Sequence, residues 1–120
     1  MLKQKEHNPM DDKKAIKQRI YEGQAFILKA LGQPNRLQIL DLLKDGERCV
    51  CEIFPPIHQE QANISKHLLI LKQAGILESR KEGLHTLYRL KNPEVLDLLK
   101  GVAKIMIDQG REQKKIMAQL

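Results

Sequence analysis

The chain has 120 residues, of which 42% are hydrophobic, so it can form one domain with a single modest core and is too short for two domains of ordinary size. Its 21 lysine and arginine residues outnumber the 15 acidic ones and give a net charge of +6, which favours a polyanionic partner. Aromatic residues make up only 3% of the chain, too few for a platform on which unpaired bases stack, so duplex DNA is the expected polyanion.

The N-terminal stretch is polar and lacks the apolar segment of a secretory signal, and no apolar run approaches the roughly 18 residues that a membrane span needs. We therefore expect a cytoplasmic protein. Residues 1–12 end in a turn-like sequence, so we expect a flexible tail there and one folded unit over residues 13–120.

Two helices are predicted at the start of this unit. Over residues 13–31, apolar residues recur at helical spacing at Ile16, Ile20, Ile27 and Leu31. Gly32 and Pro34 end this helix and open a second one over residues 34–44, which has a broad apolar face. The segment 47–58 has room for only one or two further helical turns, because Pro55 lacks a backbone N–H and disfavours helix at the preceding residue.

The next elements are an amphipathic helix and a hairpin. The helix is predicted over residues 61–74, with Ile64, Leu68 and Leu71 facing inward and a polar outer face. Two short alternating runs, 76–81 and 85–90, flank Gly83 and predict a β-hairpin with glycine at the tight position.

The last predicted helix spans residues 92–120 and carries an apolar seam that steps four and then three residues: Val95, Leu99, Val102, Met106, Ile116 and Leu120. A chain of this size has little surface against which so long a stripe can be buried. We therefore expect a homodimer through the terminal helices. The alternative is that the helix frays from Gly110 onward.

This order of elements is mainly α with a β-hairpin wing, which is the arrangement of a winged helix-turn-helix, in which the polar-faced helix enters the major groove. Residues 24–99 resemble the ArsR/SmtB family of dimeric bacterial and archaeal repressors. The segments that carry the resemblance are LGQPNRLQIL, the CVCEI box, ISKHLLILKQAGIL and the RKEG wing tip. The CVCEI box is similar to the metalloid-sensing box of the arsenic-responsive branch of that family.

The resemblance implies DNA contacts from the polar-faced helix and the wing. On the helix, the matching positions carry side chains suited to base edges and phosphates: Gln61, Asn63, Ser65 and Lys66. His67 either contacts DNA as in the family or packs at the edge of the helix. In the wing, Arg80 and Lys81 can reach phosphates or the minor groove, but Leu84 and His85 stand where family members often carry a further arginine.

Cys49 and Cys51 are the candidate effector ligands, because two thiolates at one place chelate soft ions such as trivalent arsenic, antimony or another soft metal. Residues two apart in a regular helix point about 200° apart, so a shared ion would require the third helix to unwind locally. The chain has no third cysteine, so the site is completed by a small ligand or a partner subunit, or is no metalloid site. A disulfide that acts as a redox switch and two inert cysteines are the competing hypotheses.

The predicted function is therefore a dimeric repressor that binds an imperfect palindromic DNA operator, needs no cofactor for DNA binding, and is released by an effector at the cysteine pair. It is expected not to be an enzyme. The rival classes are a small thiol oxidoreductase that uses the CxC pair and a protein-interaction module. An oxidoreductase would place its cysteines at a strand-to-helix turn in a cleft, whereas these lie beside a helix-turn-helix pattern.

Overall fold

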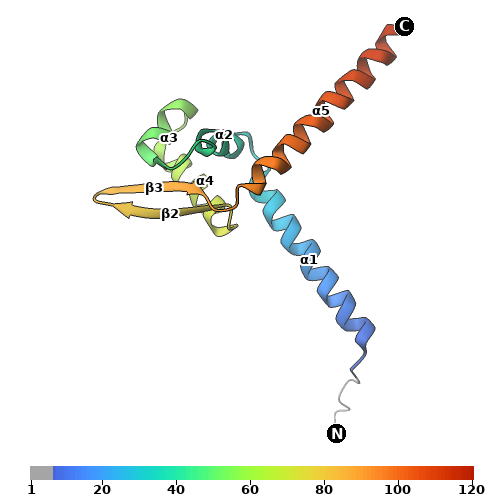
Figure 1. Cartoon of the computed structure of the whole chain (residues 1–120), viewed down its shortest axis with the longest axis horizontal. Helices are drawn as coiled ribbons and strands as arrows, with labels where there is room; N and C mark the ends of the chain where they lie inside the picture. Colours follow the sequence, from blue (N-terminus) through green and yellow to red (C-terminus); the bar gives the residue numbers. More distant parts are fainter. Residues whose placement is uncertain (1–6) are drawn as a thin grey trace.

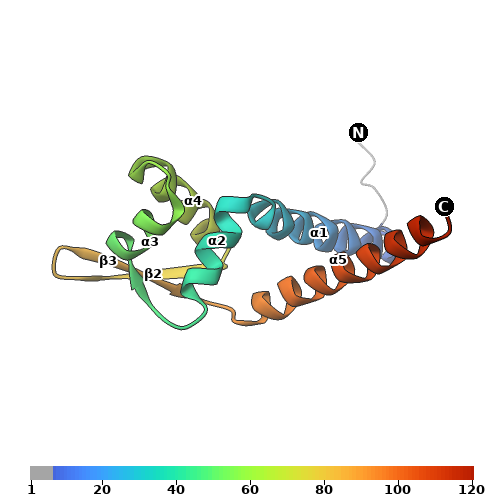
Figure 2. The same ribbon diagram turned by 90° about the horizontal axis from the view of Figure 1, so that it is seen from above.

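The computed structural model describes residues 7–120, and within them the chain forms a small winged body from which two long helices project as separate arms (Figure 1). The arms are α1 (Pro9–Leu31) and α5 (Glu94–Ala118). The radius of gyration is 20.5 Å, well above the roughly 14 Å of a compact domain of this length, so the arms do not fold back onto the body. Both arms leave the same end of the body (Figure 2).

Helix α1 begins earlier than its apolar periodicity predicts, because polar residues define its start. The side chain of Asn8 accepts a hydrogen bond from the Met10 N–H at 3.0 Å, and Pro9 occupies the first helical position. The carboxylates of Asp11 and Asp12 in the first turn stabilise the helix, because they lie at the positive end of its dipole. The flexible tail predicted for residues 1–12 falls partly on residues 1–6, which lie outside the described residues.

The body is built on three short helices, α2 (Pro34–Leu43), α3 (Val50–Ile57) and α4 (Gln61–Gln73). Their apolar side chains fill most of the core. The largest fully buried ones are Ile39, Leu40, Leu43, Ile53, Ile64, Leu68 and Leu71, and Leu77 joins them from the first strand of the hairpin. Helix α3 continues through Pro55 and Pro56 and ends where His58 adopts a left-handed conformation with φ 56°. The predicted length of one or two turns is confirmed, but the expectation that Pro55 disfavours helix at Phe54 is wrong, since both residues are helical.

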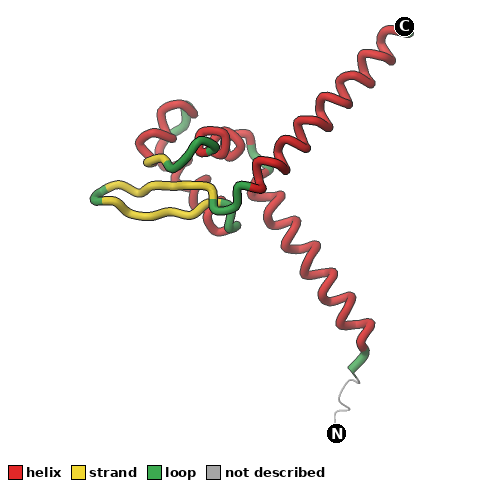
Figure 3. Tube along the Cα trace, in the orientation of Figure 1, coloured by secondary structure: helices red, strands yellow, loops and turns green. Residues whose placement is uncertain are grey.

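The hairpin is formed by β2 (Leu77–Glu82) and β3 (His85–Leu90), with Gly83 at φ +62° in the tip, as the sequence predicted. It extends from the end of the body opposite to the arms (Figure 3). A third strand, β1 (Arg48–Cys49), pairs antiparallel with β3 and gives the sheet order β1-β3-β2. Strand β1 was not predicted, because two residues are too few to show an alternating pattern.

The two faces of this sheet have different neighbours. Leu77 and Ser79 lie on the face toward α4, since Leu77 is fully buried and Lys72 of α4 donates to Ser79 Oγ at 2.8 Å. Alternation along β2 puts Lys81 on that same face. Cys49 pairs with Leu87, and Leu87 pairs with Arg80, so the opposite face carries Cys49, Arg80, Glu82, His85 and Leu87.

Arg36 of α2 is the one charged side chain buried among the described residues, and it links three helices. Its Nη1 donates to the main-chain oxygens of Lys29 and Ala30 at 3.3 and 3.2 Å, in the last turn of α1. Its Nε donates to Nδ1 of His67 in α4 at 3.1 Å. A cation at a helix C-terminus satisfies carbonyls that lack partners within the helix, so Arg36 fixes the base of the α1 arm against α4.

The fold class predicted from the sequence, mainly α with a β-hairpin wing, is confirmed. None of the helices among residues 7–120 is both long enough and apolar enough to cross a lipid bilayer.

The contact between Arg36 and His67 predicts a pH-dependent stability. Burial, and then the charges of Arg36 and Lys66, lower the pKa of His67, and a protonated Nδ1 could not accept from Arg36. Below a pH of about 6.5 the unfolded chain therefore binds more protons than the folded chain does. The free energy of unfolding then decreases as the pH falls. Urea unfolding at pH 7.5 and 5.5 should show a larger decrease for the wild type than for His67→Asn, whose amide oxygen accepts without titrating. Equal decreases would contradict this.

Candidate nucleic-acid interface and thiol site

Helix α4 presents the four predicted contact residues in one exposed arc. Since an α-helix turns about 100° per residue, Lys66 lies opposite to the buried Ile64, Leu68 and Leu71, and Asn63 and Ser65 lie to either side of Lys66. Gln61 is exposed because it stands at the first position of the helix. Glu60, the N-cap of α4, makes no side-chain cap hydrogen bond. The structure therefore brings these four residues together on a polar surface beside the wing.

His67 lies at the edge of this arc and is half-buried. Its Nδ1 is occupied by the hydrogen bond from Arg36, so one of its two ring nitrogens is turned toward the core. Of the two roles that the sequence left open for His67, this geometry favours packing at the helix edge.

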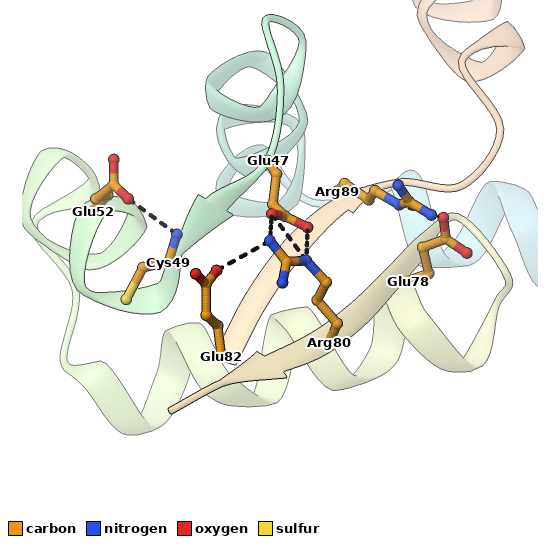
Figure 4. A network of polar contacts seen from close by, with 7 residues as sticks. All are labelled: Glu47, Cys49, Glu52, Glu78, Arg80, Glu82 and Arg89. Atoms are coloured by element: carbon orange, nitrogen blue, oxygen red, sulfur yellow. Dashed lines mark hydrogen bonds and ion pairs between the residues drawn. The ribbon is translucent and has the colours of Figure 1, made fainter. Parts of the chain in front are cut away.

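Arg80 and Lys81 are neighbours in the sequence but lie on opposite faces of the wing. The guanidinium of Arg80 donates to the carboxylate of Glu47 at 2.7, 2.9 and 3.2 Å and to Glu82 at 3.1 Å (Figure 4). The hydrogen bond from Arg80 holds the pKa of Glu47 below its ordinary value, so this pair is charged at neutral pH. Lys81 is exposed and has no ion pair among the residues that the structure describes.

Cys49 and Cys51 form the thiol site, and it lies at the N-terminus of α3. Cys49 is the N-cap, with extended backbone angles of φ −71° and ψ 150°, and its sulfur accepts from the Cys51 N–H at 3.2 Å. The Cys49 N–H donates to Glu52 Oε1 at 3.2 Å, which completes a capping box (Figure 4). The Cα atoms are 5.2 Å apart, and the two sulfurs are joined as a disulfide.

This geometry corrects one expectation. We predicted that the two sulfurs could share an ion only if the third helix unwound, and that prediction is wrong, because Cys49 precedes the helix. The extended backbone of the N-cap turns its side chain toward the first turn of the helix, where Cys51 lies. Both sulfurs therefore meet while α3 stays intact.

His85, in the first position of β3, also reaches the thiol site. Its Nδ1 is 3.7 Å from Cys49 Sγ, and one ligand atom from each of Cys49, Cys51 and His85 lies within 4.8 Å of the others. A shallow cavity of about 320 Å³ is lined by these three residues together with Glu52, Glu82 and Leu87. In the sequence, His85 stood out only as a residue in place of a further arginine in the wing. Its closeness to Cys49 depends on the pairing of β1 with β3, which the sequence did not reveal.

Comparison with known proteins places this geometry in a family. The model of the bacterial regulatory proteins of the arsR family matches residues 33–79. An HTH-type transcriptional regulator of Methanocaldococcus jannaschii is 44% identical over 71% of this chain and 97% of that protein. The arsenical resistance operon repressor of Escherichia coli is 38% identical over 77% of each chain.

A solved structure agrees with these sequence relatives. The homodimeric winged helix-turn-helix DNA-binding domain from Mycobacterium bovis, described as a possible ArsR-family transcriptional regulator, has a TM-score of 0.69 and 33% identity over 78% of this chain and 89% of that one. The family consists of transcription regulators and not of enzymes, as expected from the sequence. The chain belongs to the ArsR family of winged helix-turn-helix transcriptional repressors.

Proposed function

We propose that this protein is a dimeric repressor that binds an imperfect palindromic operator through α4 and the wing and is released by an effector at Cys49 and Cys51. The observation that carries the DNA-binding part is the exposed polar surface that Gln61, Asn63, Ser65 and Lys66 form in the first two turns of α4. One such surface per protomer would occupy one half-site, so a two-fold dimer would match a palindrome.

Dimerisation is supported by the apolar surface of the arms. On α1, five large apolar side chains are between 41% and 57% exposed: Ile16, Ile20, Phe26, Ile27 and Leu28. On α5, Val102, Met106 and Ile116 of the predicted seam are likewise exposed, and the helix runs past Gly110 to Ala118. Such apolar stripes on projecting helices need a partner to cover them. The Mycobacterium bovis relative is described as homodimeric.

The effector part is supported by the place of the thiol site in the fold. Helix α3, which Cys49 caps, packs against the recognition helix α4, and Cys49 itself pairs with the wing strand β3. A ligand on the sulfurs can therefore alter both DNA-contacting elements. Thiolates favour soft ions, and two relatives are named arsenical resistance operon repressors, so trivalent arsenic or antimony, or another soft metal, is the proposed effector.

A second candidate effector is an oxidant, favoured by the disulfide between Cys49 and Cys51. In that mechanism the two thiols lose two protons and two electrons to a small disulfide, which is reduced to two thiols. The new S–S bond replaces the thiolates, so a metal ion and the oxidised pair exclude each other.

The opposite orientations of Arg80 and Lys81 predict unequal contributions to DNA binding. Lys81→Ala should weaken operator binding and lower the slope of log affinity against log salt by about 1, because it removes one phosphate contact. Arg80→Ala should have a smaller effect, since Glu47 and Glu82 already engage its guanidinium. Fluorescence anisotropy with duplex operator over a salt series measures both. A larger effect for Arg80→Ala would show that the ion pairs open on DNA.

The effector mechanism predicts that arsenite weakens operator binding by the reduced protein. The coupling should lie toward the lower end of the five- to 150-fold range that is typical of linked sites, because only two thiolates are present. Cys49→Ser and Cys51→Ser should each abolish the response and leave binding without arsenite nearly unchanged. The measurement is operator anisotropy under reducing conditions with and without arsenite.

A parallel titration with oxidised glutathione distinguishes the redox mechanism, in which the wild type loses two hydrogens in mass and the serine variants do not respond. If neither arsenite nor the oxidant changes operator affinity, the cysteines have no sensing function.

A further inference from the structure

We propose that His85 is the third ligand of a cation site that it forms with the thiolates of Cys49 and Cys51, and that this site takes a divalent, borderline-soft cation of the Zn²⁺ or Cd²⁺ class. The inference rests on the proposed function only in that it uses the same thiol site. It assigns to the wing a ligand that the cysteine box alone does not supply.

The distance between the ligands fits such an ion. In a tetrahedral zinc site, bond lengths of about 2.3 Å to sulfur and 2.05 Å to nitrogen place the two atoms about 3.6 Å apart. Cys49 Sγ and His85 Nδ1 are 3.7 Å apart, and the Cys51 ligand atom lies within 4.8 Å of both. Once the disulfide between Cys49 and Cys51 is reduced, an ion at the centre requires the exposed Cys51 side chain to rotate so that its sulfur moves away from that of Cys49.

The fold, and not side-chain flexibility, creates this spacing. Cys49 pairs with Leu87 across the sheet, and His85 precedes Leu87 by two residues, so alternation brings the imidazole to the same face as the thiol. Cys49 is 7% exposed, whereas Cys51 and His85 are exposed. The site is thus anchored on a buried sulfur and open on its outer side, where an ion can enter.

The chemistry of the donors selects the class of cation. Two thiolates and one imidazole suit Zn²⁺ and similar ions, whereas Mg²⁺ and Ca²⁺ require oxygen ligands. The nearby carboxylates are already engaged, since Glu52 accepts from the Cys49 N–H and Glu82 pairs with Arg80. The three S and N donors leave a fourth position on the solvent side. Arsenite can bind through the two thiolates alone, so its binding does not depend on His85.

The ligand set gives the ion a specific structural effect. Cys49 and Cys51 lie at the start of α3, whereas His85 lies next to the wing tip at Gly83. An ion held by all three would tie the helix that packs against α4 to the strand that follows the wing tip. It would thereby fix the wing relative to the recognition helix.

The test uses the full chain, fully reduced and without oxygen, and measures Zn²⁺ affinity by competition with a chromophoric chelator. His85→Asn should weaken Zn²⁺ binding by at least tenfold, since even loss of a residue that only orients a metal ligand typically costs 10- to 100-fold. His58→Asn is the matched control and should bind as the wild type does. His58 is exposed at the opposite end of α3, and asparagine tolerates its left-handed conformation. Addition of Cd²⁺ should shift the imidazole Nδ1 resonance of His85 and not that of His58.

Arsenite affinity separates ligation from a structural role. The inference predicts that His85→Asn binds arsenite as the wild type does, and Cys49→Ser should lose both Zn²⁺ and arsenite. Unchanged Zn²⁺ affinity in His85→Asn, an unshifted His85 resonance, or loss of arsenite together with Zn²⁺ would each overturn the inference. Release of operator DNA by arsenite would still support the proposed function in those cases. Conversely, Zn²⁺ binding that depends on His85, without any effect of thiol ligands on operator binding, would support the site and overturn the effector part of the proposed function.

Discussion

Cys49 is at once the last residue of β1 and the N-cap of α3, and this double position connects the thiol site to the rest of the body. Its place in β1 pairs it with Leu87 in the wing, and its sulfur accepts from the first turn of α3. A helix cap contributes about 1 kcal/mol to stability. A ligand that binds the sulfur thus acts on a helix cap and a strand pair together. Loss of the cap alone, at about 1 kcal/mol, is enough to shift an equilibrium between two arrangements about fivefold.

Two polar links complete this connection. On the sheet face that carries Cys49, Arg80 joins Glu82 in the wing to Glu47 in the loop before β1 (Figure 4). In the body, Arg36 joins the last turn of α1 to α4 through His67. The first link relates the wing to the thiol site, and the second relates the arm to the recognition helix. In the dimer that we propose, the distance between two recognition helices would be set through the second link.

Much of the fold could be predicted from the sequence because its signals are local. Apolar spacing, Gly32 with Pro34, and Gly83 in the hairpin depend on neighbours within a few residues, and each gives the element that the structure shows. The polar outer face of α4 follows from the same periodicity, whereas its four candidate DNA contacts came from the resemblance to the family. The start of α1 differed from the predicted residue 13 because Asn8 and Pro9 define it through capping. Apolar spacing gives no information about caps.

The parts of the site that sequence analysis missed depend on contacts between distant segments. Strand β1 exists only because β3 offers it a partner, and His85 reaches Cys49 across 36 residues of sequence. The ion pair of Arg80 with Glu47 spans 33 residues. The expectation that α3 must unwind was wrong because the helix begins at Val50, one residue after Cys49. Had Cys49 been inside the helix, the two sulfurs would have pointed apart.

In the mechanism that we propose, an effector binds both sulfurs while α3 stays folded, and it acts through the cap of α3 and through β3. Hydrogen exchange resolved by NMR, on the reduced protein with and without Cd²⁺, can test this mechanism. We expect changed exchange at the amides of Cys51 and Glu52 and along β3, with Ile53, Phe54 and Ile57 as protected as before. Exchange at unfolded rates in those last three residues would show that the ion is held by an unwound helix, and the mechanism would be wrong.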